Sequence, residues 1–330
     1  MDDISYTAMV VEEPEKKRFT REIQKVLLKD LPDNDVLIRV LYSSLNYKDA
    51  LSATGNRGVT RNYPHTPGID AAGVVEESRA NSVRKGEKVI VTSYDLGMNT
   101  NGGFGQYIRV PADWVVRMPM GLDEKESMIF GTAGFTAGMS VFKLIQTLRP
   151  GNGDILVTGA TGGVGSMAVA ILSRLGYSVV ALSGKTDTGF LGGLGAKAVI
   201  SRKEFLADIG PPVLKPRFAG AIDTVGGEIL ATAVKSVKQD GIVTCCGNVA
   251  SPDLPLNVYP FILRGVSLFG IDSQHCPMDL RALIWKKLSR EWKFDLLSSI
   301  YDETDLKGLN EKIDLMLKGE LKGRTIVNLN

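Results

Sequence analysis

The chain of 330 residues is poor in the side chains that bind transition metals, with three cysteines and two histidines. The cysteines, Cys245, Cys246 and Cys276, all lie in the last third of the chain, and the histidines are His65 and His275. A structural zinc site needs about four Cys or His ligands close together in the fold, and a catalytic site about three protein ligands. The sequence therefore predicts no zinc site of either kind. The odd number of cysteines favours a reducing compartment, so we expect a cytoplasmic protein.

The chain also lacks a strong net charge and a convincing membrane segment. Its formal net charge of +2 is too small to indicate nucleic acid or an anionic membrane as the main partner. The N-terminal residues are acidic and polar, so no secretory signal is expected. Residues 155–173 carry no charge, but their four glycines argue against a transmembrane helix. No Gly-x-Ser-x-Gly motif is present, and neither histidine is placed to pair with a nucleophile.

Up to about residue 123, the sequence predicts strands and turns rather than helices. Residues 35–43, 86–95 and 105–119 are rich in β-branched and aromatic side chains, and Pro, Gly and Asn separate them. This pattern indicates an antiparallel, barrel-like domain.

From about residue 150 to 275, short apolar segments alternate with helical ones. Strands are expected at 154–159, 177–183, 197–201, 219–225, 241–247 and 266–272, and helices near 163–175 and 188–194. Such alternation builds a parallel sheet with helices on both faces. The last segment, RTIVNL at 324–329, is predicted to be a strand that returns to the first domain, which would then be discontinuous in sequence.

A glycine-rich segment, VTGATGGVG at 157–165, stands between the first of these strands and the following helix. At the three glycine positions of the dinucleotide fingerprint, Gly-x-Gly-x-x-Gly, the chain has Ala160, Gly162 and Gly165. Gly162 would let the backbone approach a pyrophosphate, and Gly165 would let the helix pack closely on the strand. Free N–H groups at the helix start would bind the anion. The expected cofactor contacts are Thr161, Gly162, Gly163 and Val164.

The end of the second strand predicts which dinucleotide is bound. A carboxylate there would bind the ribose 2′-OH of NAD, but this strand ends in Ser183, followed by Gly184 and Lys185. Ser183 can donate a hydrogen bond to a 2′-phosphate, and Lys185 supplies a positive charge. Arg202, after the third strand, would add a second positive charge, whereas the carboxylate of Asp187 lies past the turn. We therefore expect NADPH rather than NADH.

Polar residues also follow strands elsewhere. In SLNYKDA, at 44–50, Asn46 and Asp49 stand three residues apart and would share one helix face. Asn248 and Ser273 follow two strands of the alternating region, and ligands bind at the carboxyl ends of strands in doubly wound sheets. These residues are candidates for a binding cleft.

Together these features resemble the medium-chain dehydrogenase/reductase superfamily, in its zinc-independent quinone oxidoreductase branch. The more specific stretches are similar to the acrylyl-CoA reductase group. They are SSLNYKDALSATG (43–55), PGIDAAGVV (67–75), GTAGFTA (131–137), GAIDTVGG (220–227) and PFILRGVSLFGIDS (260–273). Zinc enzymes of the superfamily have Gly-His-Glu within the second stretch, where Asp70 replaces the His-Glu pair.

The resemblance implies an α/β protein of two domains, usually a homodimer. A GroES-like, mostly antiparallel β-barrel domain would cover 1–124 and 300–330, and a Rossmann domain with a doubly wound parallel sheet would cover 125–299. The implied activity is NADPH-dependent hydride transfer, without metal, to an activated C=C bond in an acrylyl-CoA-like thioester or small enone. NADPH:quinone oxidoreduction is the alternative, and a non-catalytic NADPH-binding redox sensor is an alternative of another class.

The resemblance also implies roles for single residues. Tyr47 would lie beside the cofactor and either orient the nicotinamide or relay a proton, with water as the alternative proton source. Asn46, as a hydrogen-bond donor, and Asp49 would occupy the polar positions of the site. Further contacts around the nicotinamide would come from Thr132, Asn248, Ile262 and Ser273. A CoA substrate also carries phosphates, for which the candidate cations are Lys48, Arg57, Arg61 and Arg264.

Overall fold

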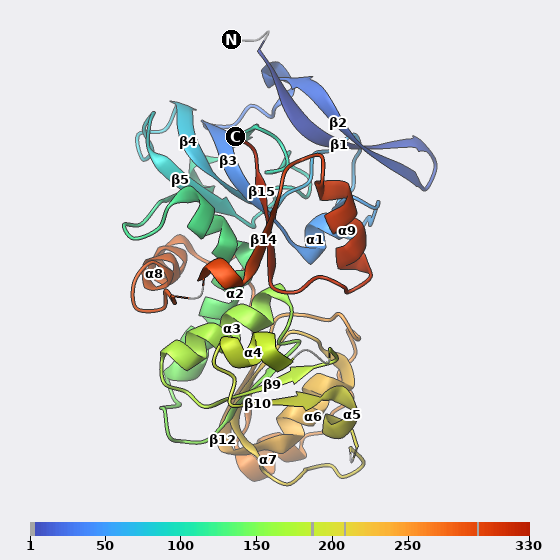
Figure 1. Cartoon of the computed structure of the whole chain (residues 1–330), viewed down its shortest axis with the longest axis vertical. Coiled ribbons are helices and arrows are strands. Elements are labelled where there is room, and N and C mark those ends of the chain that lie inside the picture. The colour runs from blue at the N-terminus through green and yellow to red at the C-terminus, as the bar shows by residue number, and fades with distance from the viewer. Residues whose placement is uncertain (1–3, 186–187, 208, 296) are drawn as a thin grey trace. The chain divides into compact units, whose positions relative to one another are not determined.

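The computed structural model describes residues 4–185, 188–207, 209–295 and 297–330 (Figure 1). The chain forms two compact units. Unit 1 consists of Met1–Thr132, Gln274–Arg290 and Leu297–Asn330, and unit 2 consists of Ala133–Ser273 and Glu291–Leu296. The predicted domains were 1–124 with 300–330 and 125–299, whereas residues 125–132, 274–290 and 297–299 belong to unit 1. The boundaries of the folding domains stay a prediction.

Unit 1 is built on a mostly antiparallel sheet of seven strands. The strand order is β14-β15-β3-β4-β5-β7, with β6 also paired to β3. The strands are β3 (Val36–Leu45), β4 (Asp70–Ser78), β5 (Lys88–Thr92), β6 (Tyr107–Val110), β7 (Val116–Arg117), β14 (Tyr301–Thr304) and β15 (Arg324–Asn328). Val36, Ile38 and Val40 of β3 are buried in one core cluster, and Leu37 between them is buried in a second, because successive side chains of a strand point to opposite faces.

Strand β3 organises this sheet because it is paired along both edges. One edge pairs with β4, whereas the other pairs first with β6, at residues 36–39, and then with β15, at residues 42–45. The C-terminal strand therefore lies beside a strand from the first fifth of the chain, and Figure 1 shows the red β15 next to the blue β3. The sequence predicted that a strand at 324–329 returns to the first domain, and β15 indeed belongs to unit 1.

The remaining elements of unit 1 are a hairpin and several helices. The hairpin of β1 (Ser5–Glu15) and β2 (Arg18–Leu27) is joined to the rest of unit 1 through backbone hydrogen bonds, including a mutual pair between Val11 and His65. The α-helices that lie within unit 1 are α1 (Tyr47–Ser52), α8 (Met278–Leu288) and α9 (Leu309–Leu317), and the 3-10 helices are Leu28–Asp30, Ala112–Trp114 and Leu297–Ser299. Helices α1 and α9 pack against each other.

Unit 2 is a doubly wound sheet of six parallel strands. The order is β10-β9-β8-β11-β12-β13. The strands are β8 (Ile155–Thr158), β9 (Val179–Ser183), β10 (Ala198–Ser201), β11 (Phe218–Asp223), β12 (Val237–Cys245) and β13 (Ser267–Gly270). The helices are α3 (Gly163–Arg174), α4 (Thr188–Gly193), α5 (Arg202–Phe205), α6 (Gly227–Ser236) and α7 (Tyr259–Arg264). Strand order reverses between β8 and β11, and such a reversal is where dinucleotides bind in this architecture.

Helix α2 (Glu124–Ile145) is, among the described residues, the helix that is long and apolar enough to cross a membrane. Of its most apolar window, 72% is buried inside the protein, as in a core helix. Backbone dihedrals break it at Gly131, where φ is +51°. The uncharged stretch 155–173 forms no single helix, because it contains β8, a turn and most of α3.

Candidate functional site

The loop between β8 and α3 has the geometry of an anion-binding turn. Gly162 is the N-cap of α3 and is exposed, and a side chain added there would approach only the carbonyl oxygen of Gly159, at 3.3 Å. No acidic residue stands in the first turn of the helix, so its free N–H groups and the positive end of its dipole are not neutralised locally. Thr161 is buried beside this turn, and Gly163 and Val164 are half-buried. These four predicted residues therefore lie together and fit a pyrophosphate.

Two other glycines of the loop are required by packing. Gly159 has φ of +57°, and a Cβ atom there would lie 2.3 Å from the hydroxyl of Thr224. At Gly165 a Cβ atom would lie 2.4 Å from the carbonyl oxygen of Gly159. Helix α3 thus starts in direct backbone contact with the end of β8, which is the role that the fingerprint gives to its last glycine.

A buried carboxylate connects the ends of β8 and β11 next to this loop. Asp223 accepts a hydrogen bond from the hydroxyl of Thr158 at 2.7 Å, and its other oxygen accepts from the backbone N–H of Gly226 at 2.8 Å. Burial raises the pKa of the Asp223 carboxyl, while these hydrogen bonds oppose the shift. Asp223 was not among the predicted site residues, although a single acidic residue at the end of an apolar strand could have indicated it.

The structure brings the predicted 2′-phosphate residues together. Ser183, the last residue of β9, is buried, and its hydroxyl oxygen accepts a hydrogen bond from the backbone N–H of Lys185 at 3.0 Å. Arg202 opens α5 after the adjacent strand β10, and a Cβ atom on Gly184 would lie 3.1 Å from its Nε atom. The guanidinium therefore lies against the loop that follows β9. Asp187, the carboxylate noted in this segment, lies outside the described residues.

Of the residues predicted around the nicotinamide, Thr132 belongs to unit 1, and the three in unit 2 separate into two groups. Asn248 and Ser273 follow β12 and β13, so they belong to the same carboxyl edge of the parallel sheet as the glycine loop. Ile262 is 67% exposed on α7. Arg264 of the same helix donates hydrogen bonds to the carbonyls of Lys235 and Val237, where β12 begins. The structure therefore does not bring Ile262 to the edge that carries the glycine loop.

A buried polar network in unit 1 is centred on Asp70. Its carboxylate accepts hydrogen bonds from the hydroxyl of Ser44 at 2.5 Å and from the side-chain amide of Asn46 at 2.8 Å. It also accepts from the backbone N–H of Thr132, at 3.0 and 2.9 Å to its two oxygens, and from the Thr132 hydroxyl at 2.6 Å. The predicted site residues Asn46 and Thr132 thus both donate hydrogen bonds to Asp70, for which the sequence predicted no role.

Arg324 supplies the positive charge of this network. The guanidinium is 3% exposed, and its Nη2 atom lies 3.7 Å from the Asp70 carboxylate. It donates hydrogen bonds to the carbonyl of Ile129, the side-chain oxygen of Asn46 and the hydroxyl of Ser44, at 3.1, 3.1 and 2.7 Å. Burial lowers the pKa of Arg324, and the nearby carboxylates oppose this shift. Arg324 was not among the predicted site residues, although an arginine at the start of an apolar strand could have indicated it.

The polar segment at α1 contains one exposed and two buried candidates. Asp49 is fully buried; its oxygens accept hydrogen bonds from the backbone N–H groups of Asn46 and Ile69, each at 2.8 Å. Burial, with a smaller contribution from Asp70, raises the pKa of Asp49 to about 7. Asn46 is also buried, whereas Tyr47, the first residue of α1, is 43% exposed.

Three of the four cations suggested for CoA phosphates already have hydrogen-bond partners within the chain. Lys48 donates to the side chain of Gln274 at 2.6 Å. Arg57 pairs with Glu13, donates to the backbone carbonyl of Arg61 and lies over two aromatic rings. Arg264 belongs to unit 2, where it donates to three backbone carbonyls.

No group of three or more His, Cys, Asp or Glu side chains that could hold a metal ion occurs in the described ranges. At the position where zinc enzymes of the resembling superfamily have a His-Glu pair, Asp70 is occupied by hydrogen-bond donors and has the Arg324 guanidinium beside it. A dication there would meet a like charge, so these residues do not fit zinc.

Two protein-family models match the chain. "Alcohol dehydrogenase GroES-like domain" matches residues 32–120, and "Zinc-binding dehydrogenase" matches residues 163–290. The first match lies in unit 1, and the second covers most of the doubly wound sheet.

Three similar proteins are relevant to the site. "Putative quinone oxidoreductase YhfP" of Bacillus subtilis is 44% identical over 310 residues, which are 93% of this chain and 94% of that protein. "Acrylyl-CoA reductase AcuI" of Ruegeria pomeroyi is 41% identical over 331 residues, or 98% of this chain and 99% of that one. The crystal structure of the yhdH oxidoreductase from Salmonella enterica in complex with NADP has a TM-score of 0.95 and 40% identity, with 98% and 100% of the two chains covered. The structure of B. subtilis yhfP with NAD bound has a TM-score of 0.96 at 42% identity, with coverage of 99% and 100%.

Proposed function

Since the chain belongs to the medium-chain dehydrogenase/reductase family, in its quinone oxidoreductase branch, we propose that it uses NADPH to reduce an activated C=C bond. The predicted family and the predicted combination of a GroES-like domain with a Rossmann domain are confirmed. One observation carries the proposal: 41% identity with an acrylyl-CoA reductase extends over 98% of this chain. The exposed turn at Gly162 is the local feature that supports dinucleotide binding.

The binding residues of unit 2 support NADPH over NADH. Backbone N–H groups around Gly162 would hold the pyrophosphate, and Lys185 with Arg202 would neutralise the 2′-phosphate. One similar structure contains NADP and another contains NAD. The preference for NADPH is therefore argued from the cations of this chain. We expect the KM for NADPH to be well below the KM for NADH. The Arg202→Gln variant should raise the KM for NADPH and leave that for NADH unchanged. A lower KM for NADH would contradict this assignment.

When bound, NADPH supplies a hydride to the β-carbon of the acceptor, and a proton added to the α-carbon completes the reduction. Tyr47 is the exposed polar side chain of its segment, so we propose that it contacts the reacting groups and orients them or relays the proton. Water is the alternative source of that proton.

Asn46 and Asp49 are better suited to positioning Tyr47 than to binding substrate. The side-chain amide of Asn46 already donates to the carbonyl of Ser44 and to Asp70. The Asp49 carboxylate accepts a hydrogen bond from the backbone N–H of Asn46, the residue just before Tyr47. We therefore assign both residues to holding the start of α1, and Thr132 to holding Asp70.

We propose that the reaction needs no metal, although one matching family model is named for zinc. The donors around Asp70 and the adjacent guanidinium of Arg324 support this. Turnover should survive dialysis against a chelator, and elemental analysis should find no stoichiometric zinc. Loss of activity that only zinc restores would contradict the proposal.

The substrate class is tested by steady-state kinetics with NADPH. We expect a higher kcat/KM for acrylyl-CoA than for a small benzoquinone. The alternative, quinone reduction, is favoured by the name of the B. subtilis relative and would be supported by the opposite order. Tight NADPH binding without oxidation by either acceptor would support the redox-sensor alternative.

We also propose that the chain forms a homodimer through one face of unit 2. Strand β13 is an edge strand of the parallel sheet. Large apolar side chains that are 39–67% exposed gather in the preceding segment: Val249, Leu254, Val258, Tyr259, Ile262 and Leu263. An edge strand beside such a patch is typical of a surface that another chain covers. This role also offers a reason for the exposure of Ile262.

A further inference from the structure

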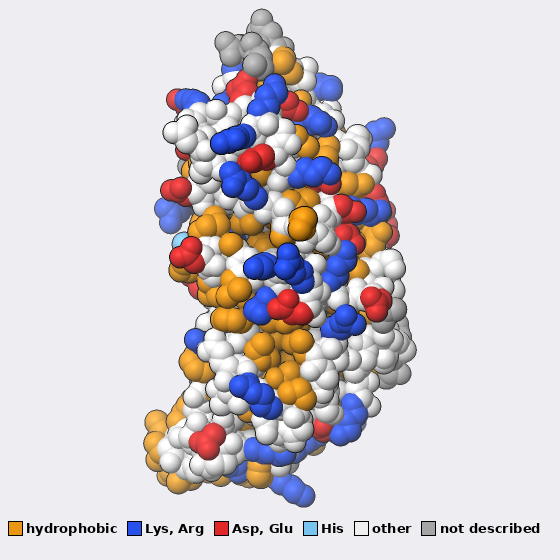
Figure 2. All heavy atoms as spheres, turned by 90° about the vertical axis from the view of Figure 1, so that its left-hand side faces the viewer, with side chains coloured by type: hydrophobic (Ala, Val, Ile, Leu, Met, Phe, Trp, Pro, Cys, Tyr) orange, Lys and Arg blue, Asp and Glu red, His pale blue; other side chains and the backbone are white. Residues whose placement is uncertain are grey.

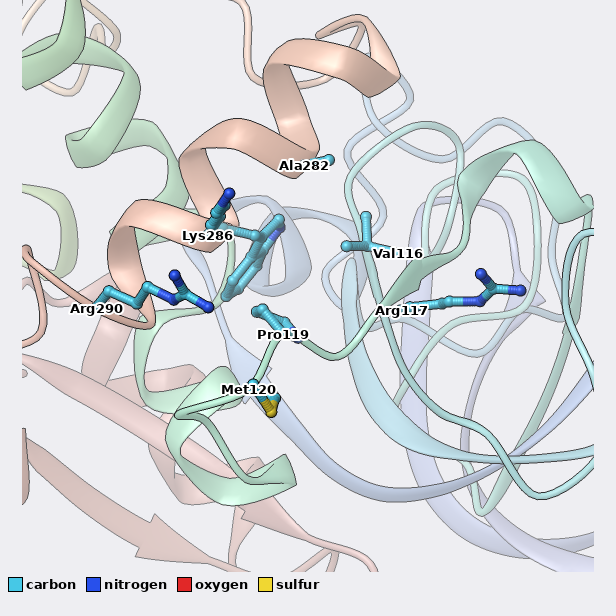
Figure 3. Close-up of a pocket in the computed structure, with 8 residues that line it drawn as sticks. Val116, Arg117, Pro119, Met120, Ala282, Lys286 and Arg290 are labelled. Atoms are coloured by element: carbon cyan, nitrogen blue, oxygen red, sulfur yellow. The ribbon is translucent and has the colours of Figure 1, made fainter.

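A pocket of about 300 Å³ opens in unit 1 between α8 and residues 116–120 (Figure 3). Its apolar lining includes Pro119, Met120 and Trp285, and its cations are Arg117, Lys286 and Arg290. None of these residues belongs to the network around Asp70 or to the glycine loop. The pocket therefore needs an explanation of its own.

Two of the three cations are available to a ligand. The side chains of Lys286 and Arg290 are exposed and form no ion pair or side-chain hydrogen bond with the described part of the chain. Arg117 instead bonds Glu87 at 3.2 Å and the carbonyl of Ser82 at 2.6 Å, and Figure 3 shows its guanidinium pointing away from the other two. The helix dipole explains why a cation stands at the end of α8, but not the apolar cavity beside it.

The two walls of the pocket meet in a close backbone contact at Gly121. The Trp285 side chain is fully buried, while Met120 is 81% exposed on the opposite wall. Gly121 has φ of +101°, and a Cβ atom there would lie 2.4 Å from the carbonyl oxygen of Ser289. The turn after Met120 therefore contacts the end of α8 through its backbone. Figure 2 shows the side of the molecule on which α8 lies in Figure 1, with Lys and Arg side chains beside hydrophobic ones.

An apolar wall next to two unpaired cations fits a purine nucleotide with more than one phosphate, because the base needs apolar contact and the phosphates need positive charge. We propose that this pocket binds the 3′-phospho-ADP part of coenzyme A. The proposal rests on the proposed reduction of an acrylyl-CoA-like thioester, and it replaces the four cations suggested by the sequence with Lys286 and Arg290.

The length of α8 supports this assignment. Before the helix begins, Gln274 accepts a hydrogen bond from Lys48, the residue after Tyr47. The 11 residues of α8 span about 16 Å at 1.5 Å per residue. The pantetheine arm contains about as many chain bonds as four amino-acid residues, so it extends over about 14 Å. A nucleotide bound at Lys286 and Arg290 would thus leave the thioester within reach of the end of α8 that adjoins Lys48.

The first test is calorimetric titration with 3′,5′-ADP. The double variant Lys286→Gln/Arg290→Gln should bind it about tenfold more weakly than the unmodified chain, because two exposed charge contacts are lost. Lys318→Gln removes an equally exposed lysine at the end of α9 and should change nothing. AMP, which lacks the 3′-phosphate, should bind more weakly than 3′,5′-ADP. Equal affinity of the double variant and the unmodified chain for 3′,5′-ADP would overturn the proposal.

The second test compares acrylyl-CoA with the acrylyl thioester of N-acetylcysteamine, which lacks the nucleotide. In the double variant, KM for acrylyl-CoA should rise about tenfold with kcat unchanged, and both constants for the short thioester should stay the same. An equal rise in KM for both substrates would refute a nucleotide subsite. If the unmodified chain reduces neither thioester, the proposed function fails, but the titration still decides whether the pocket binds the nucleotide.

Discussion

Arg324 and Asp70 are both buried, and each stabilises the charge of the other within a network of hydrogen bonds. Removing one partner leaves an uncompensated charge in the core, which costs about 3–5 kcal/mol. We expect Arg324→Gln to lower the free energy of unfolding by about this amount in urea denaturation. Arg18→Gln, which removes one partner of an exposed ion pair with Glu15, is the control and should leave the denaturation midpoint unchanged. Equal midpoints for all three proteins would show that the buried pair contributes nothing.

The raised pKa of Asp49 predicts a pH dependence of stability. The pKa is about 7 in the fold against an ordinary value of 3.8, so between these values the folded chain holds a proton that the unfolded chain releases. This contribution to stability is complete below about pH 4 and is lost as the pH rises through about 7. Asp49→Asn removes this contribution to stability. The NH2 group of the new side chain would also face the N–H of Asn46 or of Ile69, so that two donors would meet.

We therefore expect Asp49→Asn to be less stable than the unmodified chain, by a margin that shrinks as the pH rises from 4 to 7. Urea denaturation at several pH values measures this margin. A margin that stays constant, or widens, would contradict the raised pKa.

Tyr47 allows a direct test of the proposed chemistry. If its hydroxyl takes part in proton transfer, Tyr47→Phe should lower kcat about 100-fold and leave the dissociation constant for NADPH unchanged. Tyr259→Phe, at a similarly exposed tyrosine on α7, is the matched control and should be fully active. An unchanged kcat in Tyr47→Phe would leave Tyr47 a packing role and favour water as the proton source.

At the scale of elements, two glycines of the loop between β8 and α3 are expected to have different roles. Gly162 would serve cofactor binding, and Gly165 would serve helix packing. A Cβ atom at Gly162 would approach only one backbone oxygen, at 3.3 Å, so Gly162→Ala should fold normally while its methyl group obstructs the pyrophosphate. We expect at least a tenfold higher dissociation constant for NADPH, measured by fluorescence titration, with an unchanged melting temperature.

Gly165→Ala should behave in the opposite way. Its Cβ atom would lie 2.4 Å from the carbonyl oxygen of Gly159 and 2.8 Å from the Cα atom of Ala160, so the helix must move away from the strand. We expect a loss of about 1–3 kcal/mol in the free energy of unfolding. If both variants lost NADPH affinity and stability in the same proportion, the proposed division of roles between Gly162 and Gly165 would be wrong.

Local patterns explain how far these elements could be predicted from the sequence. The helices expected near 163–175 and 188–194 are α3 (Gly163–Arg174) and α4 (Thr188–Gly193). A glycine turn marks where α3 begins, and Gly193 and Gly195 mark where α4 ends. Residues 105–119 were expected to be largely extended, but they contain the short strands β6 and β7 with a 3-10 turn between them. That turn follows Pro111, which lacks the N–H that a longer strand would use in pairing.

Contacts between distant segments could not be predicted in this way. Asp70 meets Arg324 only because β4 and β15 pair with opposite edges of β3, and no local periodicity encodes that register. Ile262 shows the converse limit: the resemblance suggested a cofactor contact, but the proposed role of its exposed side chain is in dimer formation. That cofactor contact stays a prediction.

At the scale of the whole molecule, the apolar face on α7 determines the expected assembly state. Leu263 is 59% exposed there, and Leu263→Asp would place a charge in the proposed dimer interface. We expect the unmodified chain to sediment as a dimer and this variant as a monomer. Leu317→Asp, on the exposed side of α9, should remain dimeric. A monomeric unmodified chain would contradict the proposed interface.

The pairing of β15 with β3 has a consequence for synthesis in the cell. A ribosome makes residue 45 of β3 long before residue 324. Residues 42–45 of β3 therefore lack their partner strand β15, and Asp70 lacks the Arg324 cation, until β15 has been made. The nascent chain can assemble its parallel sheet earlier, but the network beside Tyr47 is complete only once residues 324–328 have been made. Chains that stop before residue 324 should therefore bind a dinucleotide but show no catalytic turnover.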